Sequence, residues 1–470
     1  MVDQAGVPRL VTAPGEGFRW MLRATGVRVV GRIRHVVCWA SAVGMIVAAG
    51  LQFSRWLLRV PVPHELVFLA VALGVALPTG MWWSWADGVL ARAGRSTLRF
   101  LAGGFSVLML SPVVWVFTGA REVWDAYPLV LIMWIMLWHM AVVIVGYVAV
   151  AAGTGGRLLT ALGGMLKRGA TGEAEPVDAD CGQSPGLTRR SVLVMAGSAL
   201  PLVLAGTGTA GGLKQAGRFR VRRIQMAAPR LPRHLKGLTV THISDMHVGR
   251  LYTPDHLPRL VEAVNDLGSD MVVITGDVVD HAIQFLPCAL EAIGQMEHRY
   301  GRFSVVGNHD LIDSPQRFLA AYGLSEPGLL CDVSRPVLID GERIQVAGLM
   351  WSFQEYATGR DPGHARRADV ALLGSDPACF TLGLVHHPHA FDALAARGVD
   401  VVLAGHTHGG QLMLTPPGAQ RPIGGGSLWF KYLWGVYQRE ASLLHVTSGV
   451  GNWFPVRINA PAEIVQIQLV

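Results

Sequence analysis

The stretch of this sequence with the most evident chemistry is "GHTHGGQ", residues 405–411, which directly follows the apolar run "DVVLA". Four more short motifs of Asp, Asn and His follow other apolar runs: "DMH" at 245–247, "GDVVD" at 276–280, "GNHD" at 307–310 and "HHP" at 386–388. The preceding runs are short and rich in β-branched residues, which is typical of buried strands. Because strand ends of an α/β sheet converge on one crevice, we expect the five motifs to meet there.

Asp, Asn and His without Cys form a ligand set suited to divalent Mn, Fe, Co or Zn. Several such groups can hold two ions about 3.5–4 Å apart, with a carboxylate bridging them. Two ions can stabilise both the attacking and the leaving oxygen of a phosphoryl displacement and can lower the pKa of a shared water. One such motif occurs often by chance, and a lone histidine is usually structural. Five motifs in succession, each after a strand, indicate a dinuclear metal site.

The elements that must position these motifs lie in the C-terminal part of the chain. From about residue 219, short β-branched runs alternate with amphipathic helix patterns at 255–267, 285–298 and 315–323. This pattern predicts an α/β domain with a largely buried sheet, which we assign to residues 214–470. Its three cysteines, of five in the chain, show neither zinc spacing nor a disulfide framework.

The N-terminal part has the composition of a membrane domain. The chain is 51% hydrophobic and only 16% charged, whereas about 25% is usual for a soluble protein. Four runs of 20, 21, 21 and 31 residues contain no Asp, Glu, Lys or Arg: 35–54, 66–86, 100–120 and 126–156. Crossing a bilayer takes about 20 apolar residues. We therefore expect an N-terminal multi-span α-helical membrane domain, with four helices in residues 35–156.

A polar linker is expected at 157–190, and a fifth, weaker span at 191–213. This span follows "TRR" and partly resembles a twin-arginine export signal; the alternative is a Gly/Ala-rich hairpin on the membrane. The Lys and Arg residues outside the expected spans number 14 on one side of the membrane and 3 on the other. Because the side richer in these residues is normally cytoplasmic, the basic leader, 1–34, should be cytoplasmic and the C-terminal domain extracytoplasmic. Eight basic residues within 214–236 argue against this orientation. They could instead rest on anionic lipid or belong to a solvated edge strand.

The order D-x-H, G-D-x-x-D, G-N-H-D, H-x-P, G-H-x-H resembles that of the calcineurin-like metallophosphoesterases, over residues 219–470. "GHTHGGQ" and "SGVGNWFPVRINAPAEI", residues 448–464, resemble one membrane-associated bacterial branch. The layout with several spans ahead of the domain is similar to that of the transmembrane proteins with a metallophosphoesterase domain. The resemblance implies an αββα sandwich with two divalent metal ions (Mn, Fe, Zn or Co) at the strand ends.

The resemblance also implies seven metal ligands, all from the five motifs: Asp245, His247 and His408 for the first metal, Asp277 as the bridge, and Asn308, His386 and His406 for the second. In the H-x-P motif the ligand is the first histidine, so His387 is expected to support the ligands. His309 should face the phosphate, where it would stabilise charge or protonate the leaving group.

Four other polar residues are given different roles. Asp280 and Asp310 are expected to orient loops and ligands. Arg457 could meet a substrate phosphate or form a structural salt bridge. His139, in the fourth apolar run, is expected to be packed rather than functional.

These features together predict a membrane-anchored, multi-pass phosphoesterase of the cell membrane that hydrolyses phosphodiester or pyrophosphate bonds. Its substrate would be lipid-linked or envelope-associated, with specificity contributed by residues 351–376. The alternatives are a phosphomonoesterase, a nucleotide phosphodiesterase, or a non-enzymatic membrane sensor or scaffold. The net charge is +7, but its basic residues lie largely in the membrane part and its flank, so no nucleic acid is expected. The sequence indicates no obligate protein partner.

Overall fold

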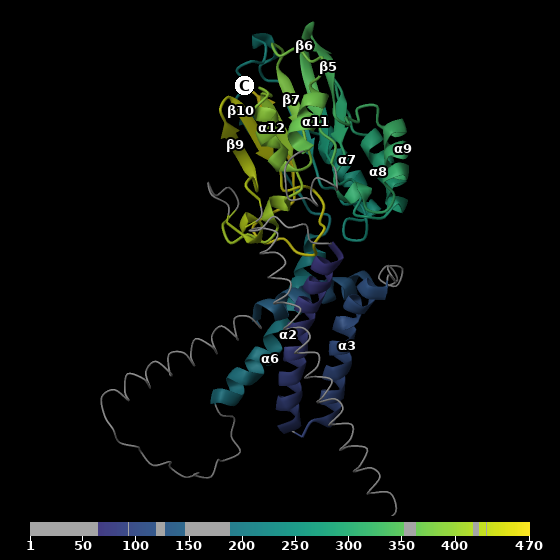
Figure 1. Ribbon diagram of the computed structural model, residues 1–470, viewed down its shortest axis with the longest axis vertical. Helices are drawn as coiled ribbons and strands as arrows, with labels where there is room; N and C mark the ends of the chain where they lie inside the picture. The colour runs from purple at the N-terminus through teal and green to yellow at the C-terminus, as the bar shows by residue number, and fades with distance from the viewer. Residues whose placement is uncertain are drawn as a thin grey trace, which may run out of the picture. The chain divides into compact units, whose positions relative to one another are not determined.

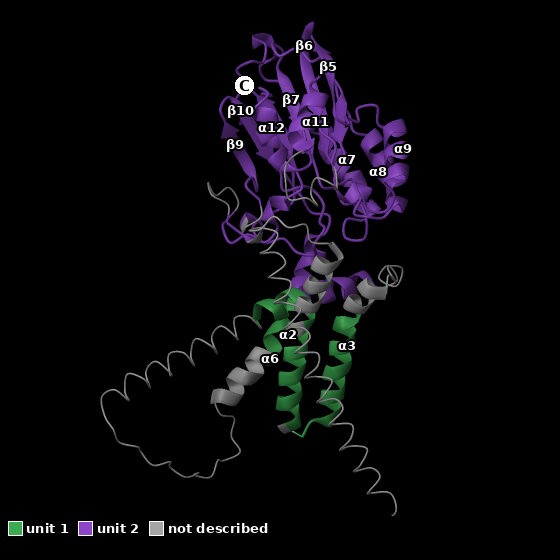
Figure 2. Cartoon of the chain, in the orientation of Figure 1, with its two compact units in different colours: residues 1–127, 138–205 green, residues 128–137, 206–470 purple. Residues whose placement is uncertain are grey.

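The computed structural model describes residues 64–92, 94–118, 127–145, 189–351, 363–416, 423–428 and 430–470. The chain divides into two compact units (Figure 2). Unit 1 comprises Met1–Tyr127 and Trp138–Ala205, and unit 2 comprises Pro128–Leu137 and Gly206–Val470. All five motifs lie in unit 2.

The strands of unit 2 are drawn as arrows in Figure 1. The first sheet has five of them, in the order β1-β11-β2-β3-β4. They are β1 (Arg220–Met226), β11 (Glu463–Leu469), β2 (Thr239–Ile243), β3 (Met271–Thr275) and β4 (Arg302–Val305). β2, β3 and β4 are parallel to one another, so their carboxyl ends reach the same edge. β11 is antiparallel to β2 and parallel to β1.

The second sheet has six strands in the order β5-β6-β7-β8-β10-β9. They are β5 (Val333–Ile339), β6 (Glu342–Gly348), β7 (Thr381–Leu384), β8 (Val401–Ala404), β10 (Ser442–Val446) and β9 (Gly435–Arg439). The four central strands are parallel, and the edge strands β5 and β9 are antiparallel to their neighbours. The motifs "HHP" and "GHTHGGQ" follow β7 and β8, two adjacent parallel strands.

Helices cover the outer face of each sheet. Those over the first sheet are α7 (Leu257–Asn265), α8 (Leu286–Gly294) and α9 (Pro315–Ser325), and those over the second are α11 (Gly363–Ala371) and α12 (Phe391–Ala395). Single 3-10 turns connect the elements: η1 (Arg233–Leu235), η2 (Pro254–His256), η3 (Ile283–Phe285), η4 (His309–Leu311), η5 (Pro388–Ala390), η6 (His408–Gly410) and η7 (Gly425–Leu428).

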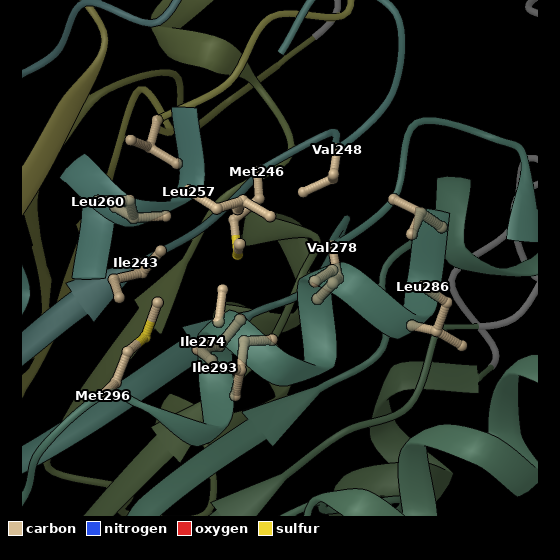
Figure 3. Packing of buried hydrophobic residues seen from close by; sticks show 14 of the residues in the cluster. Ile243, Met246, Val248, Leu257, Leu260, Ile274, Val278, Leu286, Ile293 and Met296 are labelled. Atoms are coloured by element: carbon tan, nitrogen blue, oxygen red, sulfur yellow. The ribbon is translucent and has the colours of Figure 1, made fainter. Parts of the chain in front are cut away.

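β3 shows why its sequence is apolar throughout. Met271 and Val273 lie in the core between the two sheets, whereas Val272 and Ile274 lie in the core under α7 and α8, of which Figure 3 labels Ile274. A strand buried on both faces needs an unbroken run of β-branched and other apolar residues. The result is a four-layer αββα arrangement, which confirms the expected α/β class and sandwich architecture.

Unit 1 contains the helices α2 (His64–Arg92) and α3 (Ser96–Thr118), and α6 (Arg189–Gln215) runs from unit 1 into unit 2. Polar contacts occur among these helices and residues 138–145. Trp138 Nε1 donates to Thr79 Oγ1 at 3.1 Å, and His139 Nε2 donates to a main-chain carbonyl at 2.7 Å. Arg99 pairs with Asp87 at 2.7 Å. His139 is thus packed and hydrogen-bonded, as expected.

The expected multi-span membrane domain is not supported, and this part of the predicted fold class is wrong. In the described ranges, no helix combines the length and the apolar character that crossing a membrane requires. A run that is long enough and lacks charged residues does not by itself form a membrane span, because a span must be predominantly apolar over about 20 residues. α6, for example, contains five glycines and Pro201.

Other N-terminal predictions fall outside the described residues. The leader 1–34, the first apolar run 35–54 and the linker up to residue 188 are among them. The multi-pass topology and the extracytoplasmic placement of the catalytic domain depended on counting spans, so both lose their basis.

The core between the sheets generates a prediction for stability. Ile467 of β11 is 1% exposed in this core, so Ile467→Ala should lower the free energy of unfolding by about 2–5 kcal/mol. Leu338→Ala, at a position that is 70% exposed on β5, is the matched control and should cost less than about 0.5 kcal/mol. Urea unfolding followed by circular dichroism measures both. Equal losses of unfolding free energy in the two variants would contradict the burial of Ile467 between the sheets.

Candidate metal centre

Successive side chains of the first motif, "DMH", point alternately toward the candidate site and into the apolar core. Met246 and Val248 are fully buried among the core residues shown in Figure 3, so Asp245 and His247 project in the other direction. The N–H groups of Asp245 and His247 donate to the carbonyls of Gly276 and Asp277 at 3.0 and 2.9 Å. The loops after β2 and β3 therefore continue the strand pairing beyond the sheet and hold their polar side chains together.

Asp245, His247 and His408 form a first buried cluster of ligand atoms. His247 Nε2 lies 3.0 Å from His408 Nε2, and Asp245 Oδ1 lies 3.4 Å from His408 Nε2. Two ligand atoms on one ion lie about 3 Å apart when each metal–nitrogen bond is about 2.1 Å. The spacing and the donor types of this cluster therefore fit a divalent cation.

Asn308, His386 and His406 form a second cluster. Asn308 Oδ1 lies 3.0 Å from His386 Nε2 and 2.9 Å from His406 Nδ1, and the two nitrogens are 3.1 Å apart. His386 Nδ1 donates to the carbonyl of Thr275 at 2.7 Å. When the ring is neutral, this hydrogen bond keeps the proton on Nδ1 and leaves the Nε2 lone pair directed at the cluster, as a metal ligand requires.

Asp277 lies between the two clusters. Its Oδ2 is 3.5 Å from His247 Nε2 on one side and 3.2 Å from His386 Nε2 on the other. One carboxylate can therefore reach ions held at both clusters. The seven residues predicted from the sequence as ligands are all brought together, and they come from both sheets.

The electrostatics of the site favour positive charge at its centre. Burial alone would raise the pKa of Asp277, but His386 and His309 hold it well below its usual range. Burial alone would lower the pKa of His386, yet Asp277 and Asp245 raise it to about 9. Burial lowers the pKa of His406 well below its usual range, so this imidazole is neutral and has a free lone pair.

The backbone at the site is strained. Five of the predicted ligands have positive φ angles, between 46° and 71°: Asp245, His247, Asp277, His406 and His408. Such conformations are uncommon outside glycine, although Asp, Asn and His adopt them more readily than other residues. Strain of this kind persists only where the surrounding structure enforces it, and it concentrates at functional sites.

Two glycines permit the close approach of the loops. A Cβ at Gly307 would collide with the Asp277 carboxylate, and a Cβ at Gly405 would collide with the Asp245 carboxylate. Each glycine belongs to a motif from one loop and accommodates a carboxylate from another. The glycines in the motifs are therefore required by the closeness of the ligands.

Asp310 supports the loops after β3 and β4. Its carboxylate accepts hydrogen bonds from the N–H groups of Asp277, Val278, Val279 and Gly307, at 2.8–3.1 Å. Burial and the neighbouring Asp277 raise the pKa of Asp310 to about 6. Its place is thus behind the ligands, where the sequence had placed it.

His309 lies at the edge of the clusters, beside Asp280. The main-chain N–H of His309 donates to Asp277 Oδ1 at 2.8 Å, and its ring Nδ1 is 3.5 Å from Asp280 Oδ1. Burial opposes protonation, but Asp277 and Asp280 raise the pKa of His309 to about 9. The side chain is 24% exposed, whereas that of His247 is fully buried. A protonated imidazole therefore faces the open side of the site.

Arg457 has a role that the sequence did not reveal. It is buried, and it donates to His408 Nδ1 at 3.0 Å and to the carbonyl of Ala460 at 3.0 Å. Within the described part of the chain, the hydrogen bonds of its guanidinium go to main-chain carbonyls, Asn452 and His408, not to a carboxylate. Instead of the expected phosphate contact or salt bridge, the guanidinium holds the main chain around His408. Its bond to Nδ1 places the proton of the neutral ring on Nε2, so a metal bound at Nε2 would have to displace this contact. Arg457 and His408 are 49 positions apart in the sequence, which explains why no local pattern could show this contact.

An aromatic wall, also missed from the sequence, adjoins the second cluster. The ring of His387 stacks on Trp351 at 5.6 Å and lies 4.6 Å from the ring of His406, and Phe430 lies 5.5 Å from His406. Burial lowers the pKa of His387 well below its usual range. His387 is therefore a neutral packing partner of the ligand beside it.

Residues 238–410 match the family model of the calcineurin-like phosphoesterases, the segment that contains all five motifs. This part of the chain is a calcineurin-like metallophosphoesterase domain. Curated relatives include a transmembrane protein with metallophosphoesterase domain from Danio rerio, 32% identical over 52% of this chain and 56% of its own length. An uncharacterized metallophosphoesterase from Helicobacter pylori is 30% identical over 50% of this chain and 60% of its own.

The chain thus spans somewhat more than half the length of these curated relatives. Among solved structures, a dimetal phosphatase from Danio rerio aligns with 46% of this chain and 88% of its own, at 12% identity and a TM-score of 0.30. That similarity is too low to argue from, so the family assignment rests on the sequence matches and the motifs.

The contact between Arg457 and His408 can be tested through metal binding. Arg457→Met removes the guanidinium that donates to the main-chain carbonyls of His408 and Gly451, and loss of such outer partners typically weakens metal affinity about 10–100-fold. Isothermal titration of the metal-free protein with Mn²⁺ measures this affinity. Arg439→Met, which removes an exposed partner of Asp392, is the control and should leave it unchanged. Unchanged affinity in Arg457→Met would show that the contact does not position the ligand.

The support by Asp310 makes a second prediction. Asn in its place offers one acceptor oxygen instead of two, so buried N–H groups lose partners and the free energy of unfolding should fall by about 2–4 kcal/mol. The purified Asp310→Asn protein should also retain less metal, because the loop that carries Asp277 is released. Asp313→Asn is the control, since Asp313 accepts a hydrogen bond at an exposed position. Wild-type stability and metal content in Asp310→Asn would refute the proposed support.

Proposed function

We propose that the domain is a dinuclear metal-dependent phosphoesterase that hydrolyses phosphodiester or pyrophosphate bonds. The observation that carries the proposal is the position of Asp277 Oδ2, 3.5 Å from a nitrogen of one cluster and 3.2 Å from a nitrogen of the other. A structural site for a single ion does not need a carboxylate shared between two sets of ligands. The family assignment supports the same reaction class.

The donors fit the two ions. Asp245, His247 and His408 would hold one, and Asn308, His386 and His406 would hold the other, with Asp277 common to both. When bound, two divalent ions lower the pKa of a shared water and stabilise charge on the attacking and leaving oxygens. The chain itself supplies fixed ligand positions, which cost no reorganisation during the reaction.

His309 is proposed as the group that meets the substrate. Its ring is the exposed one beside the clusters, and Asp280 and Asp277 keep it positively charged. In hydrolysis the water oxygen bonds to phosphorus, the bond from phosphorus to the leaving oxygen breaks, and that oxygen takes a proton. His309 can stabilise the negative phosphoryl oxygens and donate this proton, while Asp280 holds the ring in place.

We also infer that the protein acts at a membrane on lipid-linked phosphoesters. Two relatives that match about half of this chain are named transmembrane protein with metallophosphoesterase domain. The inference concerns association with a membrane and the class of substrate, and it is independent of how the chain is attached.

The activity is tested with the full-length protein, stripped of metal and assayed with bis(p-nitrophenyl) phosphate, with and without Mn²⁺. We expect hydrolysis that depends on Mn²⁺ in the wild type. Asp277→Asn should lose it, because a neutral amide cannot bridge two cations. Asp266→Asn is the matched control, because Asp266 is exposed and directly follows α7, and this variant should retain hydrolysis.

Each result has a separate meaning. Undiminished hydrolysis in Asp277→Asn, with the fold intact by circular dichroism, would refute the two-metal mechanism. Cleavage of p-nitrophenyl phosphate but not of the diester would favour the phosphomonoesterase. No turnover of either substrate by a protein shown to bind two metals per chain would favour a sensor.

A further inference from the structure

Four large apolar side chains are exposed on neighbouring loops of unit 2. They are Leu414 (82% exposed), Ile423 (53%), Trp453 (47%) and Ile458 (49%), named here the apolar surface. Main-chain hydrogen bonds join the loops: Leu414 N–H donates to the Ile423 carbonyl, and Met413 N–H to the Ile458 carbonyl, both at 2.9 Å. Apolar side chains gathered on adjoining loops mark an interaction site, whereas isolated ones do not.

The apolar surface begins at the metal centre. The ring of Trp453 lies 6.4 Å from that of His408, one of the proposed ligands. The loop that carries Trp453 and Ile458 also carries Arg457, which donates to His408. Whatever covers this surface therefore lies close to His408 of the proposed metal centre.

Basic residues flank the apolar surface. Gln215, in the last turn of α6, exchanges hydrogen bonds with the main chain of Arg457 at 2.9 and 3.2 Å. This places the end of α6 beside the loop of Ile458. The neighbouring Leu213, Lys214 and Arg218 are exposed.

The segments that form this region contain no acidic residue. Asp and Glu are absent from 206–226, 411–430 and 441–462, and the first of these segments carries the exposed Lys214 and Arg218. A second copy of the chain would set like charges against each other across an isologous contact. A surface of phospholipids with anionic headgroups is complementary in both respects, because it offers apolar contact and negative charge.

We infer that the apolar surface docks on an anionic lipid bilayer. Trp453 lies at the depth of the headgroups, where tryptophan is enriched, and Leu414, Ile423 and Ile458 insert beside it. Lys214 and Arg218 meet the headgroup phosphates. This docking needs no membrane-spanning helix from the catalytic domain. Resting on the proposed function, it specifies the substrate as a phosphoester of a membrane lipid, presented to the metals without leaving the bilayer.

The test uses the full-length protein with the photoreactive residue p-benzoylphenylalanine at position 414 or 458. The protein is irradiated with vesicles of phosphatidylcholine and phosphatidylglycerol, and adducts are identified by mass spectrometry. Controls carry the same residue at position 324 or 373, where the natural leucines are 88% and 84% exposed. We expect lipid adducts at 414 and 458 well above those at the controls, and fewer with phosphatidylcholine alone.

A second measurement follows binding. Leu414→Asp combined with Ile423→Asp should weaken sedimentation with the anionic vesicles about tenfold, since two apolar contacts are lost. Leu324→Asp combined with Leu373→Asp is the matched control and should not weaken it. Hydrolysis of bis(p-nitrophenyl) phosphate should be unchanged in both double variants, which shows that they are folded.

The outcomes separate this inference from the proposed activity. Lipid adducts at 414 and 458 without phosphodiesterase activity would support the surface and refute the activity. Adducts to another part of the same chain, or to a second copy, would identify a protein occupant and overturn the docking. Lipid adducts no more abundant than at the control positions would overturn it as well.

Discussion

The structure of the site depends on one constraint: the Asp277 carboxylate must lie within reach of two sets of ligand nitrogens. Its Oδ2 meets His247 on one side and His386 on the other, while Oδ1 accepts the N–H of His309. To hold it there, the backbone of Asp277 adopts a φ of 53°, and Gly307 must lack a side chain. The buried carboxylate of Asp310 holds the loops in this arrangement by accepting hydrogen bonds from their N–H groups.

The two sheets contribute different chemistry to this constraint. The first supplies all the acidic and amide ligands and one histidine, whereas the second supplies only histidines. The carboxylate of Asp245 accepts the N–H of His406 at 3.0 Å, so a charged group of one sheet directly holds a ligand loop of the other. The apolar core between the sheets must therefore keep their relative position, because a shift would separate the two halves of each metal cluster.

Much of the fold and the candidate site could be predicted from the sequence, because the relevant signals are local. Each ligand lies within a few residues of a short apolar strand, and strand ends of parallel sheets converge. "DMH" illustrates this: one apolar residue between two polar ones assigns Met246 to the core and leaves Asp245 and His247 for the site. Asp310 was expected to orient loops and ligands, and the loop N–H groups that donate to its carboxylate agree with this expectation.

The features that were missed depend on distant contacts. Arg457 reaches His408 across 49 residues, and Trp351 stacks on His387; neither pairing leaves a periodic or spaced pattern. The error in the N-terminal part has another origin. Absence of charge was taken as evidence for spans, but Thr79, Trp138 and His139 use their polar atoms in bonds between segments, and glycines dilute α6.

The loop 449–459 connects the interior of the site to its surroundings. A Cβ at Gly451 would collide with the carbonyl of Met246, so the loop lies directly against the chain that carries Asp245. Arg457 points inward to His408, and Trp453 and Ile458 are exposed. The inward side is fixed by several hydrogen bonds of one buried guanidinium, so contacts on the outward side need not disturb the ligands. A loop built in this way can hold a proposed metal ligand in place and still offer an apolar exterior next to the candidate metal centre.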